Sequence, residues 1–211
     1  MGANAGLGHW NPLTPVEAQE LFEPFDGPWW IAGGWAIELF AGVPIRPHDD
    51  IDIEIPRSHA RKLATAMSGW DLQLASDGRL TPWDPALPVP GNVSSVWCRP
   101  KPEPAWRIQI MFATVRDGVW HFRRDERVSR PLDEVFSFTE TGLPILAPEI
   151  QLLYKASGTR EKDEIDFRAA VKLMDAEHRA WLVEALTLVY PDSQWLRVLA
   201  DRDTNPYTVS P

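Results

Sequence analysis

The chain has 211 residues, of which 44% are hydrophobic and 24% charged, and its net charge is −9. This composition is typical of a soluble globular protein with one well-developed core. It excludes a membrane-spanning protein, because the sequence has no run of about 18 apolar residues. The single cysteine, Cys98, excludes an internal disulfide and a cysteine-only metal site.

The acidic balance also bears on partners and location. A large nucleic-acid surface normally shows as a basic face, so a nucleic-acid partner is not expected. A negative chain would suit a cationic small molecule. The first fifteen residues lack the basic start and apolar core of a signal peptide, which favours a cytoplasmic protein. Oligomeric state stays open at this stage.

The first third of the chain alternates short apolar strands with helices. Thr14, Pro15 and Glu17 form a helix start with a capping box. The expected elements are a helix over 15–22, a strand over 29–32, a helix over 34–40, an acidic strand ending before Pro56, a helix over 58–67 and a strand over 70–75. Breaks at glycine and proline separate them.

The middle and the end of the chain differ in character. Residues 77–104 are rich in Pro, Gly and Asp and are expected to form a long insertion with one strand over 95–98. Segments 106–115 and 119–123 flank Asp117-Gly118, which indicates a hairpin. Short strands are expected over 136–139 and 145–146. From Pro148 the apolar period is helical. The predicted fold is therefore α/β (α+β), with a mixed-sheet domain over 1–147 and a helical region over 148–211 packed on it.

The acidic strand is the most informative segment. In a strand, alternate side chains share one face, so Asp50, Asp52 and Glu54 are expected to point one way while the isoleucines between them enter the core. Aligned carboxylates repel one another unless a cation lies between them. Asp50 and Asp52 are therefore the predicted ligands of Mg²⁺.

The Gly33-Gly34 pair precedes these acids, at a strand-to-helix turn. The absent side chains let a phosphate approach the backbone, and a helix N-terminus offers unpaired N–H groups. Gly33-Gly34-Trp35-Ala36, Arg46 and the segment from His48 to Ile53 closely resemble the aminoglycoside 2''-adenylyltransferases and lincosamide nucleotidyltransferases, a branch of the DNA polymerase beta-like nucleotidyltransferase superfamily.

The resemblance implies a nucleotidyltransferase domain that moves a nucleoside monophosphate onto a hydroxyl of a small molecule. The donor would be ATP or another NTP, and an aminoglycoside-like antibiotic is one acceptor. Gly33 and Gly34 would bind the nucleotide, while Asp50 and Asp52 would hold Mg²⁺. Arg46 would contact phosphate or substrate, and His48 would either orient the site or make a structural hydrogen bond.

A second polar cluster follows the predicted sheet. Lys155 is a candidate for nucleotide phosphate or a solvated side chain, and the Arg160, Lys162, Asp163 and Asp166 cluster opens a helix. Lys162 and Asp166, four residues apart, are expected to form a helical ion pair. Arg123-Arg124 and Arg127 are expected at the surface, and Cys98 in the core.

One departure from the resembled family concerns its third carboxylate. The strand that should supply it carries Gln109, and an amide cannot serve as a base near neutral pH. Glu54 or Asp125 are possible substitutes. The alternatives are a nucleotide-binding protein without turnover and a toxin-like transferase acting on protein or tRNA.

Overall fold

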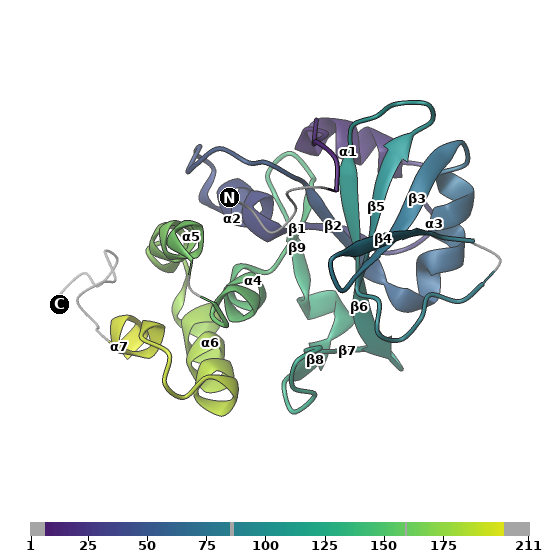
Figure 1. Ribbon diagram of the computed structural model, residues 1–211. Helices are drawn as coiled ribbons and strands as arrows, with labels where there is room; N and C mark the ends of the chain where they lie inside the picture. The colour runs from purple at the N-terminus through teal and green to yellow at the C-terminus, as the bar shows by residue number, and fades with distance from the viewer. Residues whose placement is uncertain (1–6, 85–86, 159, 201–211) are drawn as a thin grey trace.

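The computed structural model describes residues 7–84, 87–158 and 160–200. Its core is one mixed sheet flanked by helices, and the predicted fold class is confirmed (Figure 1). The main strand order within the described chain is β4-β3-β5-β6-β2-β1-β10-β9, with β7 and β8 continuing from β6. The proposed boundary at residue 147 stays a prediction.

The N-terminal half contributes most of the sheet. Its elements are α1 (Pro15–Phe22), β1 (Trp30–Ala32), α2 (Gly33–Ala41), β2 (Asp52–Pro56), the 3-10 turn η1 (Arg57–His59), α3 (Ala60–Ala66), β3 (Trp70–Ser76), β4 (Arg79–Pro82), β5 (Ser95–Pro100) and β6 (Ile108–Arg116). The capping box that begins α1 is present: the Glu17 N–H donates to Thr14 Oγ1 at 3.2 Å, and the Thr14 N–H donates to Glu17 Oε2 at 2.7 Å.

The rest of the chain completes the sheet and adds the helices. These elements are β7 (Val119–His121), β8 (Ser129–Pro131), the 3-10 turn η2 (Leu132–Glu134), β9 (Phe136–Phe138), β10 (Pro144–Leu146), α4 (Pro148–Lys155), α5 (Glu161–Val171), α6 (Ala176–Val189) and α7 (Trp195–Ala200). Figure 1 shows α4 to α7 gathered on one side of the sheet, with α2 above α4. In the described residues no helix is long and apolar enough to cross a bilayer.

The expectation for residues 77–104 was partly wrong. Asp77 and Gly78 both have positive φ, 51° and 70°, and join β3 to β4 in a tight hairpin. The hairpin at Asp117-Gly118 was predicted and is present, with φ of 50° and 77°. Both turns have the Asp-Gly sequence that favours a two-residue hairpin turn, so the first was equally visible in the sequence.

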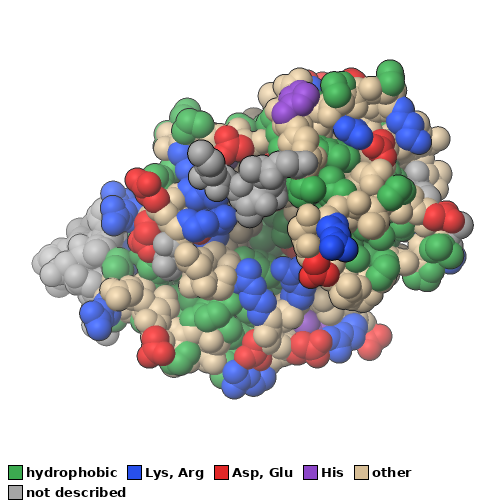
Figure 2. All heavy atoms as spheres, in the orientation of Figure 1, with side chains coloured by type: hydrophobic (Ala, Val, Ile, Leu, Met, Phe, Trp, Pro, Cys, Tyr) green, Lys and Arg blue, Asp and Glu red, His purple; other side chains and the backbone are tan. Residues whose placement is uncertain are grey.

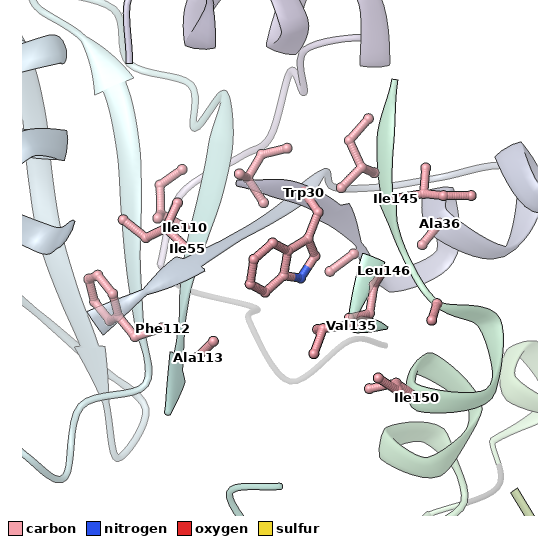
Figure 3. Packing of buried hydrophobic residues seen from close by; sticks show 14 of the residues in the cluster. Trp30, Ala36, Ile55, Ile110, Phe112, Ala113, Val135, Ile145, Leu146 and Ile150 are labelled. Carbon is pink, nitrogen blue, oxygen red and sulfur yellow. The ribbon is translucent and has the colours of Figure 1, made fainter. Parts of the chain in front are cut away.

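The two faces of the sheet differ in polarity. One face carries the fully buried Ile53, Ile55 and Ile110 and packs into the main core. The core continues across β1, where the Trp30 indole stacks on Phe136 with ring centres 5.2 Å apart. Figure 3 shows this indole near Val135 and Leu146. The opposite face carries Asp52 and Glu54; Glu54 is buried against Trp30, and only the part around Asp52 opens into a cavity.

Candidate functional site

The central cavity, about 420 Å³, lies where the open face of the sheet meets α2, α4 and the start of α5. Its lining includes six of the eight predicted site residues: Gly33, Gly34, Arg46, Asp50, Asp52 and Lys155. The other two, His48 and Glu54, do not line it. A larger cavity of about 720 Å³ at the far end of α2 contains none of the eight.

Close contacts inside this cavity require glycine at both positions of the Gly33-Gly34 turn. Gly33 has φ of +68°, and a side chain on it would overlap the Asp52 carboxylate. A side chain at Gly34 would overlap the guanidinium of Arg46. The Gly33 N–H donates to Gln151 Oε1 at 2.7 Å, so this group is not the unpaired donor that the sequence suggested. The glycines thus bring backbone, carboxylate and guanidinium together.

Asp50 and Asp52 form the acidic wall of the cavity. Asp50 was expected within the acidic strand. β2 begins at Asp52, however, so Asp50 lies in the segment before the strand. Burial and the neighbouring Asp50 carboxylate raise the pKa of Asp52 to about 7, although Lys155 and Lys162 act in the opposite direction. Asp49 is exposed and does not line the cavity. A carboxylate pair with this mutual repulsion is suited to a cation.

Glu54 does not reach the cavity. It is only 2% exposed, and its Oε2 accepts a hydrogen bond of 2.9 Å from Trp30 Nε1. Burial raises its pKa to about 7, while the Trp30 hydrogen bond and Arg123 lower it. Glu54 is therefore a buried core carboxylate, and the expectation that it could replace a missing catalytic acid finds no support in this geometry.

Gln109 occupies the place that the sequence assigned to it. β2 and β6 are parallel neighbours, and Asp52 and Gln109 are register partners. Gln109 lines the central cavity beside Asp52. The other proposed substitute, Asp125, instead pairs with Arg127 at 2.5 Å and is absent from the lining.

A buried ion-pair network joins the loop before β2 to the C-terminal helices. Asp166 is fully buried and accepts two hydrogen bonds from Arg46, from Nε and Nη2, each 2.8 Å long. Lys155 Nζ lies 2.8 Å from Asp166 Oδ2 and 3.4 Å from Asp163 Oδ1. Arg160 Nε donates to Asp163 Oδ2 at 2.8 Å. Lys155, only 8% exposed, is therefore not a solvated side chain.

This network corrects the expected helical ion pair of Lys162 with Asp166. Asp166 is occupied by Arg46 and Lys155, and Lys162 lines the cavity with no carboxylate within ion-pair distance in the described part of the chain. Arg46 is also held in place more firmly than a side chain that is free to bind phosphate, because its guanidinium donates both hydrogen bonds to Asp166.

His48 is a structural residue beside the cavity. Its Nε2 lies 2.9 Å from Glu38 Oε2, and its ring stacks on Trp35 with ring centres 4.2 Å apart. Glu38 also accepts the N–H of Ile45 at 2.9 Å. Burial would raise the pKa of Glu38, but these hydrogen bonds outweigh it and lower the pKa below its usual value. Glu38 thereby holds the loop that carries Arg46 and Asp50.

Arg123 and Arg124 line the cavity, which corrects their expected surface role. Arg124 Nη1 donates to the Tyr154 carbonyl and to Ser157 Oγ, both at 2.7 Å, and neither group is charged. Within the described residues neither arginine has a carboxylate partner at ion-pair distance. Figure 2 shows Lys and Arg side chains around the hollow at the middle of this face. The hairpin that carries them was predicted, but its closeness to the acidic strand depends on the sheet order.

The family model for aminoglycoside-2''-adenylyltransferase matches residues 16–170 of the chain, which include the Gly pair, both aspartates and the ion-pair network. The chain belongs to this family. It is accordingly a nucleotidyltransferase, and the resemblance noted in the sequence is confirmed. No curated protein matches the chain.

Solved structures of antibiotic adenylyltransferases have a similar fold. A crystal structure of the lincosamide antibiotic adenylyltransferase LnuA with lincomycin bound is 22% identical, with a TM-score of 0.54; the match covers 78% of this chain and all of that one. A crystal structure of ANT(2'')-Ia in complex with adenylyl-2''-tobramycin is 15% identical, with a TM-score of 0.55, and the match covers 82% and 95% of the two chains. A solution structure of ANT(2'')-Ia is 16% identical, with a TM-score of 0.55, and the match covers 83% of this chain and 90% of that one.

The donor set of this family member fits a magnesium ion that is bound together with phosphate. Within the described residues no group of three or more His, Cys, Asp or Glu side chains forms a metal site. Mg²⁺, however, is commonly held by one or two carboxylates together with substrate phosphates and water. Asp50 and Asp52 supply two carboxylates, and the cations of the lining that have no carboxylate partner in the described part of the chain suit the phosphates. A bare dication without nucleotide has fewer ligands here.

Proposed function

We propose that this protein is a magnesium-dependent nucleotidyltransferase that moves AMP from ATP to a hydroxyl of a small molecule. The observation that carries the proposal is the shared cavity: the Gly33-Gly34 turn, the Asp50 and Asp52 pair, and the cations of β7–α5 all line it. This combination suits a triphosphate with its cation on one side and an incoming hydroxyl on the other.

The residues divide between binding and orientation. Asp50 and Asp52 hold Mg²⁺, which neutralises phosphate charge when bound. Arg123, Arg124 and Lys162 are free of carboxylate partners in the described chain, so they are the side chains available to the triphosphate oxygens. Arg46 and Lys155 act mainly as positioning residues, because Asp166 holds both of them in place. His48 and Glu38 fix the loop that carries Asp50.

The transfer step makes one bond and breaks one. The acceptor oxygen bonds to the α-phosphorus, the bond from that phosphorus to the oxygen bridging to the β-phosphate breaks, and pyrophosphate leaves with the electron pair. The hydroxyl proton passes to Asp50, to Asp52 or to water, because Gln109 cannot accept it. We infer that the protein assists removal of the hydroxyl proton less than it assists the other parts of the reaction, because Gln109 stands where a carboxylate could accept that proton.

The test uses ATP labelled at the α-phosphate, Mg²⁺ and a panel of aminoglycosides and lincosamides, with pyrophosphate release measured in parallel. The proposal expects label on a small molecule, and expects it to be lost in Asp52→Asn. Label on protein or RNA would instead identify a macromolecular acceptor. Tight nucleotide binding without any label transfer would contradict the proposal and support binding without turnover, the alternative that Gln109 suggests.

A further inference from the structure

The side chain of Gln151 links the C-terminal helical layer to the Gly33-Gly34 turn. Gln151 comes from α4, is only 6% exposed and lines the central cavity. Its Oε1 accepts the Gly33 N–H at 2.7 Å, across 118 positions of the chain. A backbone N–H can only donate, so the atom that faces it is the amide oxygen, and the amide nitrogen Nε2 takes the other position. This one hydrogen bond therefore fixes the orientation of the whole amide.

Within the described residues, Gln151 Nε2 is a donor without an acceptor. It makes no hydrogen bond there, although the Asp52 carboxylate adjoins the same turn. Nε2 is not enclosed by protein either, because the enclosed polar side-chain atoms that lack a partner in the described chain are Trp35 Nε1, Trp120 Nε1, His121 Nδ1 and Glu149 Oε2. Gln151 thus presents its amide protons to the open cavity from a side chain that is held in place.

The position of this donor suits an anion. Gly33 begins α2, and the partial positive charge of a helix N-terminus favours negative groups. The amide accepts a hydrogen bond from that terminus at one end, which polarises it and strengthens Nε2 as a donor at the other. Lys155 follows Gln151 by four positions on α4, so both side chains share one face of the helix, and both line the cavity. An amide donor and an ammonium group therefore border the same part of the cavity.

We propose that Gln151 binds the nucleotide by donating from Nε2 to a phosphate oxygen while its Oε1 stays on the Gly33 N–H. This inference rests on the proposed function and adds a binding residue to it. A ligand that fills the cavity excludes water from Nε2, and an amide N–H left there without an acceptor would weaken binding. A phosphate group, whose oxygens only accept, supplies that acceptor. The Gly33 N–H, itself occupied, thereby acts on phosphate through Gln151.

Two matched variants test this role. Gln151→Met keeps a side chain of similar length and removes both hydrogen bonds, while Gln194→Met makes the same change at an exposed glutamine outside the cavity. Calorimetry with Mg²⁺ and a non-hydrolysable ATP analogue should give a Kd about tenfold higher in Gln151→Met, as expected for one lost hydrogen bond to a charged group, and an unchanged Kd in Gln194→Met. An unchanged Kd in Gln151→Met would overturn the inference. A lower Kd would also overturn it, because Gln151 would then compete with phosphate for the Gly33 N–H.

A third variant and a direct measurement cover the case in which Gln151→Met loosens the Gly turn. Gln151→Glu keeps an oxygen for the Gly33 N–H but cannot donate, so its Kd should rise at least as far; a wild-type Kd in this variant would overturn the inference. In wild type, the NMR signal of the Gln151 side-chain amide is assigned by its loss in Gln151→Met. The analogue should slow exchange of these amide protons with water by about tenfold, because a donated proton must first leave its acceptor. Unchanged exchange in the bound protein would contradict the contact.

Binding of the analogue to wild type is measured first, because it separates the two levels of the argument. A wild-type protein that does not bind the analogue refutes the proposed function, and the role of Gln151 falls with it. A wild-type protein that binds it, with the same Kd in Gln151→Met, refutes the role of Gln151 alone.

Discussion

Replacing Asp166 by Asn should destabilise the protein strongly, because this carboxylate serves two cations at once. Asp166 is fully buried, accepts two hydrogen bonds of 2.8 Å from Arg46, and lies 2.8 Å from Lys155. The substitution leaves both cations without their main partner. Breaking a buried pair by removing one member costs about 3–5 kcal/mol.

The lower end of that range applies to this site. Lys155 keeps Asp163 at 3.4 Å, and the Arg46 side chain is 12% exposed, so water can partly replace the lost carboxylate. A loss of about 3 kcal/mol in a chain of this length lowers Tm by roughly 6–12 °C, at about 2–4 °C for each kcal/mol.

Thermal and urea unfolding of wild type and variant measure this loss. The matched control is Asp133→Asn, at an exposed aspartate that has no ion pair among the described residues, where a change within about 0.5 kcal/mol is expected. Adding Lys155→Met to Asp166→Asn should restore part of the stability, because it removes one of the two unpaired charges. If Asp166→Asn behaves like the control, the proposed role of the network is wrong.

Three further outcomes follow from the site and the core. Arg124→Ala and Arg123→Ala should each raise the Kd of Mg²⁺-ATP by about tenfold, as expected for one lost charge-assisted hydrogen bond. Arg127→Ala, at a residue outside the cavity, should leave this Kd unchanged. Calorimetry of the three variants tests the difference. Glu38→Gln should lower the free energy of unfolding by about 1–2 kcal/mol near neutral pH. Because the pKa of Glu38 is lowered in the folded state, its contribution to the free energy of unfolding is complete above the unfolded-state pKa and is lost as pH falls. Urea unfolding should therefore show that the difference in stability between wild type and variant vanishes in acid. A difference that persists in acid would contradict this assignment. Burial raises the pKa of the Cys98 thiol, so iodoacetamide should label it only after unfolding, and rapid labelling of the native protein at pH 8 would refute its buried position.

Local patterns were enough to predict most of the sheet and the acidic half of the site. The alternation of isoleucine with acids located β2, and the resemblance indicated which strand carries Gln109; that this strand runs parallel to β2 and places Gln109 beside Asp52 was shown by the structure. Asp50 was misassigned to the strand, because pleat alternation alone cannot show where hydrogen bonding begins. Its side chain nevertheless reaches the same cavity.

The basic half of the site depends on tertiary structure. Lys162 and Asp166 have the spacing of a helical pair, but Asp166 faces inward and meets Arg46, which is 120 residues away in the chain. Such a bidentate buried partner outweighs a surface pair worth a few tenths of a kcal/mol. Arg123 and Arg124 could not be assigned to the site from the hairpin alone, because only the order of β6, β2 and β1 brings that hairpin to the cavity.

The central claim is that Asp50 and Asp52 hold a cation for a bound nucleotide. Thermal unfolding with Mg²⁺ and each NTP, compared among wild type, Asp50→Asn and Asp49→Asn, tests it most directly. Ligand at about 100 times its Kd adds about 2.7 kcal/mol, which corresponds to a rise in Tm of roughly 5–10 °C. We expect a magnesium-dependent rise in Tm with one nucleotide in wild type and in Asp49→Asn, whose exposed side chain lies outside the cavity, and no such rise in Asp50→Asn. An equal rise in all three proteins, or none in wild type, would contradict it.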